Sequence, residues 1–124
     1  MPTLTHVGKK VLVVDDEDIL RMLLTDTLEF EGFQVEEAED GVEALEKIQS
    51  HPYDAILLDY MMPRMTGLEL LEHLQPLKLT TPIIMLTAKA QQADQDLALA
   101  KGASYFVPKP FSPNELAELV KSLF

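Results

Sequence analysis

Side chains capable of chemistry follow several separate apolar runs of this sequence. Asp15 and Asp16 follow the first run, Asp59 and Thr87 follow two later ones, and Lys109 comes shortly after the last. Clustered carboxylate oxygens are hard ligands that suit Mg²⁺ or Mn²⁺ rather than zinc. A hydroxyl and an ammonium add donors for an anion such as phosphate. The set therefore predicts a metal-assisted site at which a phosphoryl group becomes attached to an aspartate.

Asp59 is the strongest candidate for the nucleophile, because it stands alone at the end of the apolar run Ala55–Leu58. Neighbouring acids raise one another's pKa unless a cation neutralises them, which again favours a metal. Each residue alone also has a structural interpretation. The acids are typical of helix or turn caps, and Thr87 and Lys109 are typical of turns. Their joint placement after four apolar runs favours a functional site.

Short apolar runs predict the buried strands that position these residues. The runs are Val11–Val14, Ala55–Leu58, Ile83–Leu86 and Tyr105–Val107, and the alternating segment Phe33–Glu36 predicts an edge strand. Helical periods separate them, so we expect an α/β fold with a doubly wound five-stranded parallel sheet, helices on both faces and right-handed crossovers. In such sheets the ligand site lies beyond the carboxyl ends of the strands.

Helix boundaries are also visible in the sequence. Capping boxes are predicted at Asp40–Glu43, Thr66–Glu69 and Ser112–Glu115. The helix after the first strand should end near Gly32. The segment around Gln91–Lys101 gives the weakest helical pattern, because it is rich in Ala and Gln and has few large apolar residues.

Bulk composition indicates one domain of 124 residues, with a short N-terminal tail over residues 1–9. The net charge of −11 argues against direct contact with nucleic acid or an anionic membrane. The opening MPTLTHVGKK has no apolar signal-peptide core, no run approaches a membrane span, and there is no cysteine. These features favour a cytoplasmic location.

Four segments carry a resemblance to a known family. They are VLVVDDE (11–17), ILLDYMMPRMTG (56–67), MLTA (85–88) and GASYFVPKPF (102–111). In this order and spacing the chain resembles the receiver domain of two-component response regulators, from Lys10 to Phe124. The resemblance implies a flavodoxin-like three-layer sandwich with five helices and the strand order 2-1-3-4-5.

The resemblance also implies the site residues. Asp59 would be the phosphoacceptor, and Mg²⁺, for which Mn²⁺ can substitute, would be held by Asp15, Asp16, Asp59 and the backbone carbonyl of Met61. Asp16 would bind the metal directly and Asp15 through water. Thr87 and Lys109 would contact the phosphoryl group, and the Lys109-Pro110 peptide bond would be cis.

The implied function is a signalling switch rather than a turnover enzyme. A histidine kinase or a histidine phosphotransfer protein would donate the phosphoryl group, and Thr87 and Phe106 would move in response. A downstream effector would read the surface from Ala90 to Lys121. We expect a monomer that contacts neither nucleic acid nor membrane. No output domain follows Phe124, so the receiver either stands alone or is part of a longer protein.

The sequence departs from the family pattern at several positions. Phe106 occupies the place of the switch aromatic and has no hydroxyl. A homodimer through the fourth helix, fifth strand and fifth helix is not expected, because uncharged residues replace the usual charged ones there: Gln95, Leu97, Ala100 and Ser104. Met61 and Lys89 border the path along which water is expected to approach the phosphoryl group. Neither side chain can orient that water well, which predicts a long-lived phosphoryl group.

Three alternatives remain. A phosphatase of the haloacid-dehalogenase type also uses an Asp and Mg²⁺, but it needs Asp-x-Asp after a strand, whereas Asp15-Asp16-Glu17 stands here. A flavodoxin-like cofactor binder would need a Ser/Thr/Gly-rich phosphate loop in place of the acidic DDEDIL. The third is a receiver that serves only as a docking module, which the intact acid set disfavours.

Overall fold

The parallel sheet has the strand order β2-β1-β3-β4-β5, which confirms the expected fold class and order. The computed structural model describes residues 5–88 and 92–124. The strands are β1 (Lys10–Val14), β2 (Gln34–Ala38), β3 (Ala55–Asp59), β4 (Ile83–Thr87) and β5 (Tyr105–Pro108). The helices are α1 (Asp18–Phe30), α2 (Gly41–Ser50), α3 (Gly67–Leu74), α4 (Gln92–Ala100) and α5 (Pro113–Ser122), with a short 3₁₀ helix, η1, at Gln75–Leu77.

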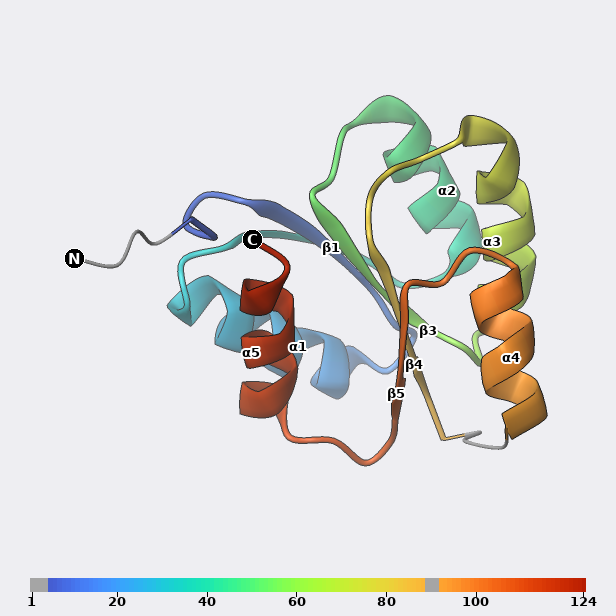
Figure 1. Cartoon of the computed structure of the whole chain (residues 1–124). Coiled ribbons are helices and arrows are strands. Elements are labelled where there is room, and N and C mark those ends of the chain that lie inside the picture. Colours follow the sequence, from blue (N-terminus) through green and yellow to red (C-terminus); the bar gives the residue numbers. More distant parts are fainter. Residues whose placement is uncertain (1–4, 89–91) are drawn as a thin grey trace.

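Two helical layers cover the sheet (Figure 1): α1 and α5 lie on one face, and α2, α3 and α4 lie on the other. The strands feed both layers because successive side chains of a strand point to opposite faces. In β1, Val11 and Val13 pack with α1 and α5, whereas Leu12 and Val14 pack with α2 and α3. This explains why β1, β3 and β4 appear in the sequence as continuous apolar runs. The prediction that Tyr105–Val107 forms a buried strand was wrong, because β5 is the edge strand and its residues are only partly buried or exposed.

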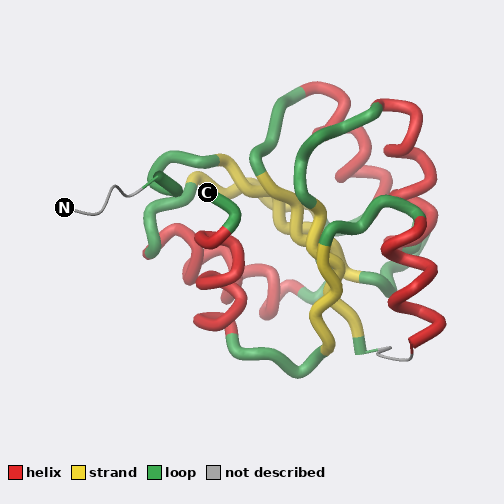
Figure 2. Tube along the Cα trace, viewed as in Figure 1, coloured by secondary structure: helices red, strands yellow, loops and turns green. Residues whose placement is uncertain are grey.

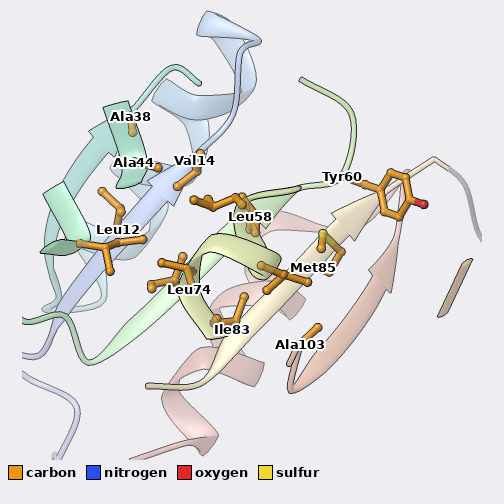
Figure 3. Packing of buried hydrophobic residues seen from close by; sticks show 14 of the residues in the cluster. Leu12, Val14, Ala38, Ala44, Leu58, Tyr60, Leu74, Ile83, Met85 and Ala103 are labelled. Carbon is orange, nitrogen blue, oxygen red and sulfur yellow. The ribbon is translucent and has the colours of Figure 1, made fainter. Parts of the chain in front are cut away.

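The buried apolar residues that include Leu12 and Val14 form a cluster between the sheet and α2, α3 and α4. Figure 3 shows Leu12, Leu58 and Met85 of three neighbouring strands and Leu74 of α3 among the residues of this cluster. Tyr60 lies at the edge of this cluster, and its hydroxyl points away from it. The cluster therefore reaches from the middle of the sheet to the residue that follows Asp59.

The edge strand lies further along the chain than the alternating pattern predicted. It covers Gln34–Ala38 instead of residues 33–36, because its register with β1 runs from Lys10↔Gln34 to Val14↔Ala38. Phe33 belongs to the preceding turn, where its N–H donates to the carbonyl of Leu28. Its ring is nearly buried in the α1/α5 layer. Tertiary packing, rather than the local alternation, determines where the strand begins.

Only one of the three predicted capping boxes is reciprocal in the structure. Thr66 and Glu69 each accept the other's backbone N–H. Asp40 caps α2 by accepting from the N–H of Glu43, but the Glu43 carboxylate accepts from Glu39 instead. At α5, Ser112 accepts from the N–H of Glu115, and no return bond forms. The predicted helix starts are nevertheless close to those observed.

All five strands run in the same direction, so their carboxyl ends meet at one edge of the sheet. Figure 2 shows the loops after β1 and β5 leaving the sheet at this edge. Within the described residues, no helix combines the length and apolar character needed to cross a membrane.

Candidate functional site

Lys109 joins the ends of three strands at the carboxyl edge of the sheet. Its ammonium nitrogen lies 3.4 Å from Oδ1 of Asp59 and 3.5 Å from Oδ2 of Asp15. It also lies 3.4 Å from Oε1 of Glu17. Asp59 is the last residue of β3, Asp15 follows β1, and Lys109 follows β5. Residues that are far apart in the sequence therefore form one charged cluster.

The Asp59 carboxyl is almost completely buried, with 3% of the residue exposed. Burial, and then the neighbouring charge of Asp15, raises the pKa of Asp59 to about 7. Lys109 and the N–H of Met61, which donates to Oδ1 at 3.4 Å, oppose this rise. The charged form of Asp59 is thus destabilised, and an additional cation would stabilise it.

Asp15 and Lys109 respond to the same surroundings. Burial raises the pKa of Asp15, although its bond from the N–H of Glu17 and the charge of Lys109 counteract the effect. Burial lowers the pKa of Lys109, but the charges of Asp59, Asp15 and Glu17 outweigh burial, so the net pKa is raised. A single ammonium faces three acids, which leaves the cluster with excess negative charge.

The acids have the composition of a site for a hard divalent cation. Among the described residues, Asp15, Glu17 and Asp59 form a group of acids that could hold a metal ion. One carboxylate oxygen of each lies within 4.8 Å of the others. Oδ2 of Asp15 is buried and accepts no hydrogen bond, and the Lys109 ammonium faces it as an ion pair at 3.5 Å. A buried carboxylate oxygen without a hydrogen-bond donor has room for a further positive ligand. The carboxylate donor set and this oxygen both fit Mg²⁺.

The structure thus adds Glu17, which the sequence interpretation did not select, to the acids at this edge. Asp16 is exposed and lies outside the group of mutually close carboxylates. Glu17 was visible in the segment VLVVDDE, but nothing in the sequence distinguishes which of three consecutive acids turns toward the sheet. Glu17 is also the residue before α1, and its side chain does not cap that helix.

The peptide after Asp59 is held on both sides. The N–H of Tyr60 donates to the carbonyl of Leu86 at 2.9 Å, and the carbonyl of Tyr60 accepts from the N–H of Gly67 at 2.9 Å. A Cβ atom at Gly67 would lie 2.6 Å from the carbonyl oxygen of Asp59. Only glycine allows the start of α3 to approach β3 this closely, so Gly67 belongs to the support of the site.

Two arginines hold the loops on either side of the cluster. Arg21 donates to the Asp15 carbonyl at 2.7 Å and to Glu37 at 2.9 Å, which ties α1 to the ends of β1 and β2. Arg64, in the loop after β3, pairs with Asp40 at the start of α2. No sequence pattern predicts the contacts of either arginine, because these contacts depend on which strands are neighbours in the sheet.

The other predicted residues that the structure describes lie at the same edge or just behind it. Thr87 is fully buried at the end of β4, and its carbonyl accepts from the N–H of Lys109 at 2.7 Å. Phe106 of β5 is partly buried against the cluster that contains Met85. Met61 is 50% exposed, so its side chain only partly covers the site. Lys89 lies outside the described residues, and the Lys109-Pro110 bond is cis, as the resemblance implied.

Comparison with known proteins gives consistent matches over this whole region. A family model described as the response regulator receiver domain matches residues 11–121. The alkaline phosphatase synthesis transcriptional regulatory protein PhoP of Bacillus subtilis is 44% identical over 117 residues, which are 94% of this chain and 49% of PhoP. The chain thus spans about half the length of the curated relatives it matches.

Solved structures agree with the sequence matches. The Francisella response regulator 1452 receiver domain has a TM-score of 0.89 and 35% identity, over 94% of this chain and 96% of that one. The response regulator TrrA of Thermotoga maritima, solved in complex with Mg²⁺ and beryllofluoride, has a TM-score of 0.83 and 41% identity, over 94% of this chain and 99% of that one.

Proposed function

The chain belongs to the family of response regulator receiver domains, phosphorylation-controlled switches of two-component signalling, and on this premise we propose that Asp59 accepts the phosphoryl group. One observation carries the proposal: the Asp59 carboxyl, nearly buried at the end of β3, faces the Lys109 ammonium at 3.4 Å. An ammonium placed beside the acceptor oxygen is positioned to bind an oxygen of the incoming phosphoryl group.

The metal in this proposal is Mg²⁺, with Mn²⁺ as a substitute. Asp15, Asp16, Asp59 and the carbonyl of Met61 would hold it, and Glu17 is a further carboxylate within reach of the cluster. When bound, the ion supplies positive charge that offsets the charge of the transferring phosphoryl group. The buried Oδ2 of Asp15, which accepts no hydrogen bond and has only the Lys109 ammonium at 3.5 Å, supports a further cation at this position.

In the transfer step, an oxygen of Asp59 forms a bond to phosphorus while the bond from phosphorus to a histidine nitrogen of the donor breaks. Asp59 must be ionised to act, and its pKa of about 7 indicates that a bound cation would increase the reactive fraction at neutral pH. Lys109 and the Thr87 hydroxyl would bind the phosphoryl oxygens afterwards. Their new contacts would bias an equilibrium of two conformations in which Phe106 takes part.

Receiver domains of this family interact with histidine kinases and downstream effectors. For this chain we propose that the phosphodonor, a histidine kinase or phosphotransfer protein, docks on α1 beside the site. Ile19, Met22 and Leu23 are exposed there at helical spacing, and a hollow lined by Leu20, Lys109 and Phe111 adjoins them. An exposed apolar stripe next to a reactive group is typical of a protein-binding surface.

The effector would bind the surface formed by residues 90–121, and the domain itself would be a cytoplasmic monomer without contact to nucleic acid or membrane. It would not turn over an external substrate. The family assignment favours neither the phosphatase nor the flavodoxin-like alternative.

The proposal is tested by incubating the protein with acetyl phosphate and Mg²⁺ and measuring its intact mass. We expect a gain of one phosphoryl group that depends on Mg²⁺ and is absent in Asp59→Asn. The matched control is Asp26→Asn, which changes an exposed carboxylate on α1 by the same chemistry. A gain that persists in Asp59→Asn, or steady hydrolysis of a phosphomonoester by the wild type, would overturn the assignment.

A further inference from the structure

The hydroxyl of Tyr60 connects the phosphoacceptor loop with α4. Tyr60 directly follows Asp59, and its hydroxyl lies 3.4 Å from Oδ1 of Asp94, in the first turn of α4. We propose that Tyr60 is a positioning residue that transmits the state of Asp59 to α4 through this hydroxyl contact. The inference rests on the proposed function, because it assigns the route by which phosphorylation of Asp59 reaches a distant surface.

Tyr60 lies between two residues of the proposed site, so a change at either of them acts on its backbone. Asp59 precedes it, and the carbonyl of Met61, a proposed metal ligand, follows it. Any ligand that draws these two groups together acts on both peptide bonds that flank Tyr60. The backbone N–H and carbonyl of Tyr60 are themselves bonded to Leu86 and Gly67. The residue is thus fixed to β4 and to the start of α3, and small shifts at Asp59 have few other ways to be absorbed.

The side chain is rigid enough to carry such a shift. The residue is 7% exposed, and its ring packs in the cluster that contains Met85, Ala98 and Ala103 (Figure 3). A tyrosine has only two side-chain torsions, and close packing of the ring limits both. Only the hydroxyl leaves the cluster, and it does so toward α4.

Helix α4 is the element best suited to respond. Within Gln92–Ala100, Ala98 is the one buried residue, whereas Leu97 and Leu99 are 43% and 46% exposed. A helix with so little apolar surface in the core is weakly fixed. The C-terminal end of α4 is held through Lys101, which pairs with Glu72, so the hydroxyl contact to Asp94 acts at the opposite end, in the first turn.

The usual aromatic position cannot supply this contact. Phe106 packs against the same cluster but has no hydroxyl, and its neighbour Tyr105 is 40% exposed. The other buried tyrosine, Tyr53, donates to Glu36 at 2.8 Å. Glu36 belongs to β2, the edge strand furthest from β5 in the sheet order, so this bond does not involve α4. Among the described residues, Tyr60 is the buried tyrosine whose hydroxyl reaches α4.

The experiment uses the full chain with Mg²⁺ and beryllofluoride as the phosphoryl mimic, followed by amide chemical shifts. The variants are Tyr60→Phe, Asp94→Ala and their combination, and Tyr53→Phe is the matched control that removes the other buried phenol hydroxyl. Tyr60→Phe retains the ring, so its melting temperature should stay close to that of the wild type.

We expect every protein to load, as seen in the amides of Met61 and Leu86. In wild type and Tyr53→Phe, the amides of Leu97–Ala100 should shift as well. In Tyr60→Phe and Asp94→Ala, the equilibrium constant between the two conformations of α4 should differ from that of the loaded wild type by about fivefold. This is the size of effect expected for the loss of one hydrogen bond. The double variant should change no further than either single variant.

Two results would overturn the inference while leaving the proposed function intact. One is an α4 response in Tyr60→Phe equal to that of the wild type, and the other is additive effects of the two substitutions. Loss of loading in Tyr60→Phe would assign Tyr60 to the binding site and would also refute the inference. If the wild type fails to load at all, both the proposed function and the inference fail.

Discussion

A Cβ atom on Gly67 would lie 2.6 Å from the backbone carbonyl oxygen of Asp59 and 3.0 Å from the Cα of Tyr60. Both neighbours are backbone atoms, which cannot rotate away as a flexible side chain can. Helix α3 begins at Gly67, and Asp59 ends β3, so this contact sets how closely the helix approaches the proposed phosphoacceptor. The absence of a side chain at Gly67 is therefore a requirement of the site.

Gly67→Ala should reduce the free energy of unfolding by about 1–3 kcal/mol, because the added methyl group overpacks a backbone contact. It should also weaken Mg²⁺ binding, since the peptide carrying Asp59 has to move. Urea denaturation and a Mg²⁺ titration measure the two effects. The control is Gly102→Ala, where space is open but φ is +114°. That variant should lose stability and retain its Mg²⁺ affinity, and equal Mg²⁺ affinity in both variants would contradict the prediction.

Mg²⁺ should raise the melting temperature, because it binds the folded cluster of acids and not the unfolded chain. Asp16→Ala should remove most of this rise, whereas Asp26→Ala, which removes an exposed carboxylate on α1, should leave it unchanged. Glu17→Ala tests which acid is the metal ligand: Asp16, which the family resemblance assigns, or Glu17, whose carboxylate lies close to those of Asp15 and Asp59. If Glu17→Ala abolishes the rise and Asp16→Ala does not, Glu17 is the ligand and the assignment of Asp16 is wrong.

The raised pKa of Asp59 predicts a pH dependence of stability in Mg²⁺-free solution. Between the ordinary value of 3.8 and about 7, the folded protein holds a proton on Asp59 that the unfolded chain releases. The folded state binds more protons in this window, so the Asp59 contribution to stability is present at low pH and is lost as pH rises toward 7.

Asp59→Asn removes this contribution from the pH profile. The difference in unfolding free energy between variant and wild type should therefore grow in favour of the variant by about 1–3 kcal/mol between acidic and neutral pH. Urea denaturation of both proteins across this range measures it. A difference that is independent of pH would show that Asp59 titrates normally in the folded state.

Lys109→Ala should leave Mg²⁺ binding intact or slightly tighter, because a positive charge near the acids is removed. It should nevertheless uncouple phosphorylation from the conformational change, since no ammonium binds the phosphoryl oxygens. Amide chemical shifts around Thr87 and Phe106 in the phosphorylated protein provide the measurement. Lys101→Ala, which removes a lysine paired with Glu72 on the surface, is the control. Unchanged shifts in Lys109→Ala relative to the wild type would refute this role.

The phosphoryl group on Asp59 should decay slowly. Hydrolysis needs a water in line behind phosphorus, and the half-exposed Met61 accepts hydrogen bonds only weakly. The double variant Met61→Asn with Lys89→Glu should decay faster, because an amide and a carboxylate can orient water. The decay of phosphorylated protein in Mg²⁺ measures the rate. Equal or slower decay in the double variant would show that these positions do not control the water.

Much of the fold could be predicted because its determinants are local. Strands buried on both faces need continuous apolar runs, and three of the four runs correspond to such strands, β1, β3 and β4, whereas the fourth corresponds to the partly exposed edge strand β5. Asp59 and Thr87 lie at strand ends because a charged or polar residue ends an apolar run. Parallel strands then bring these ends to one edge, so the acids and Lys109 could be grouped before any distance was known.

The features that escaped prediction depend on contacts between segments remote in the sequence. The start of β2 follows from its register with β1, and Phe33 is drawn into the core instead of the sheet. The side chain of Glu17, rather than that of Asp16, faces Lys109 because the turn after β1 orients it so.

The sequence by itself determined that carboxylates, a hydroxyl and a lysine gather at the carboxyl edge, since strand periodicity and residue type suffice for that. Only the tertiary structure decided how they are held. Gly67 is needed because α3 abuts the Asp59 peptide, and the Tyr60 hydroxyl meets Asp94 because the fold brings the first turn of α4 to the residue that follows β3. Such pairings arise from close packing in three dimensions, and no local pattern along the chain encodes which two atoms will meet.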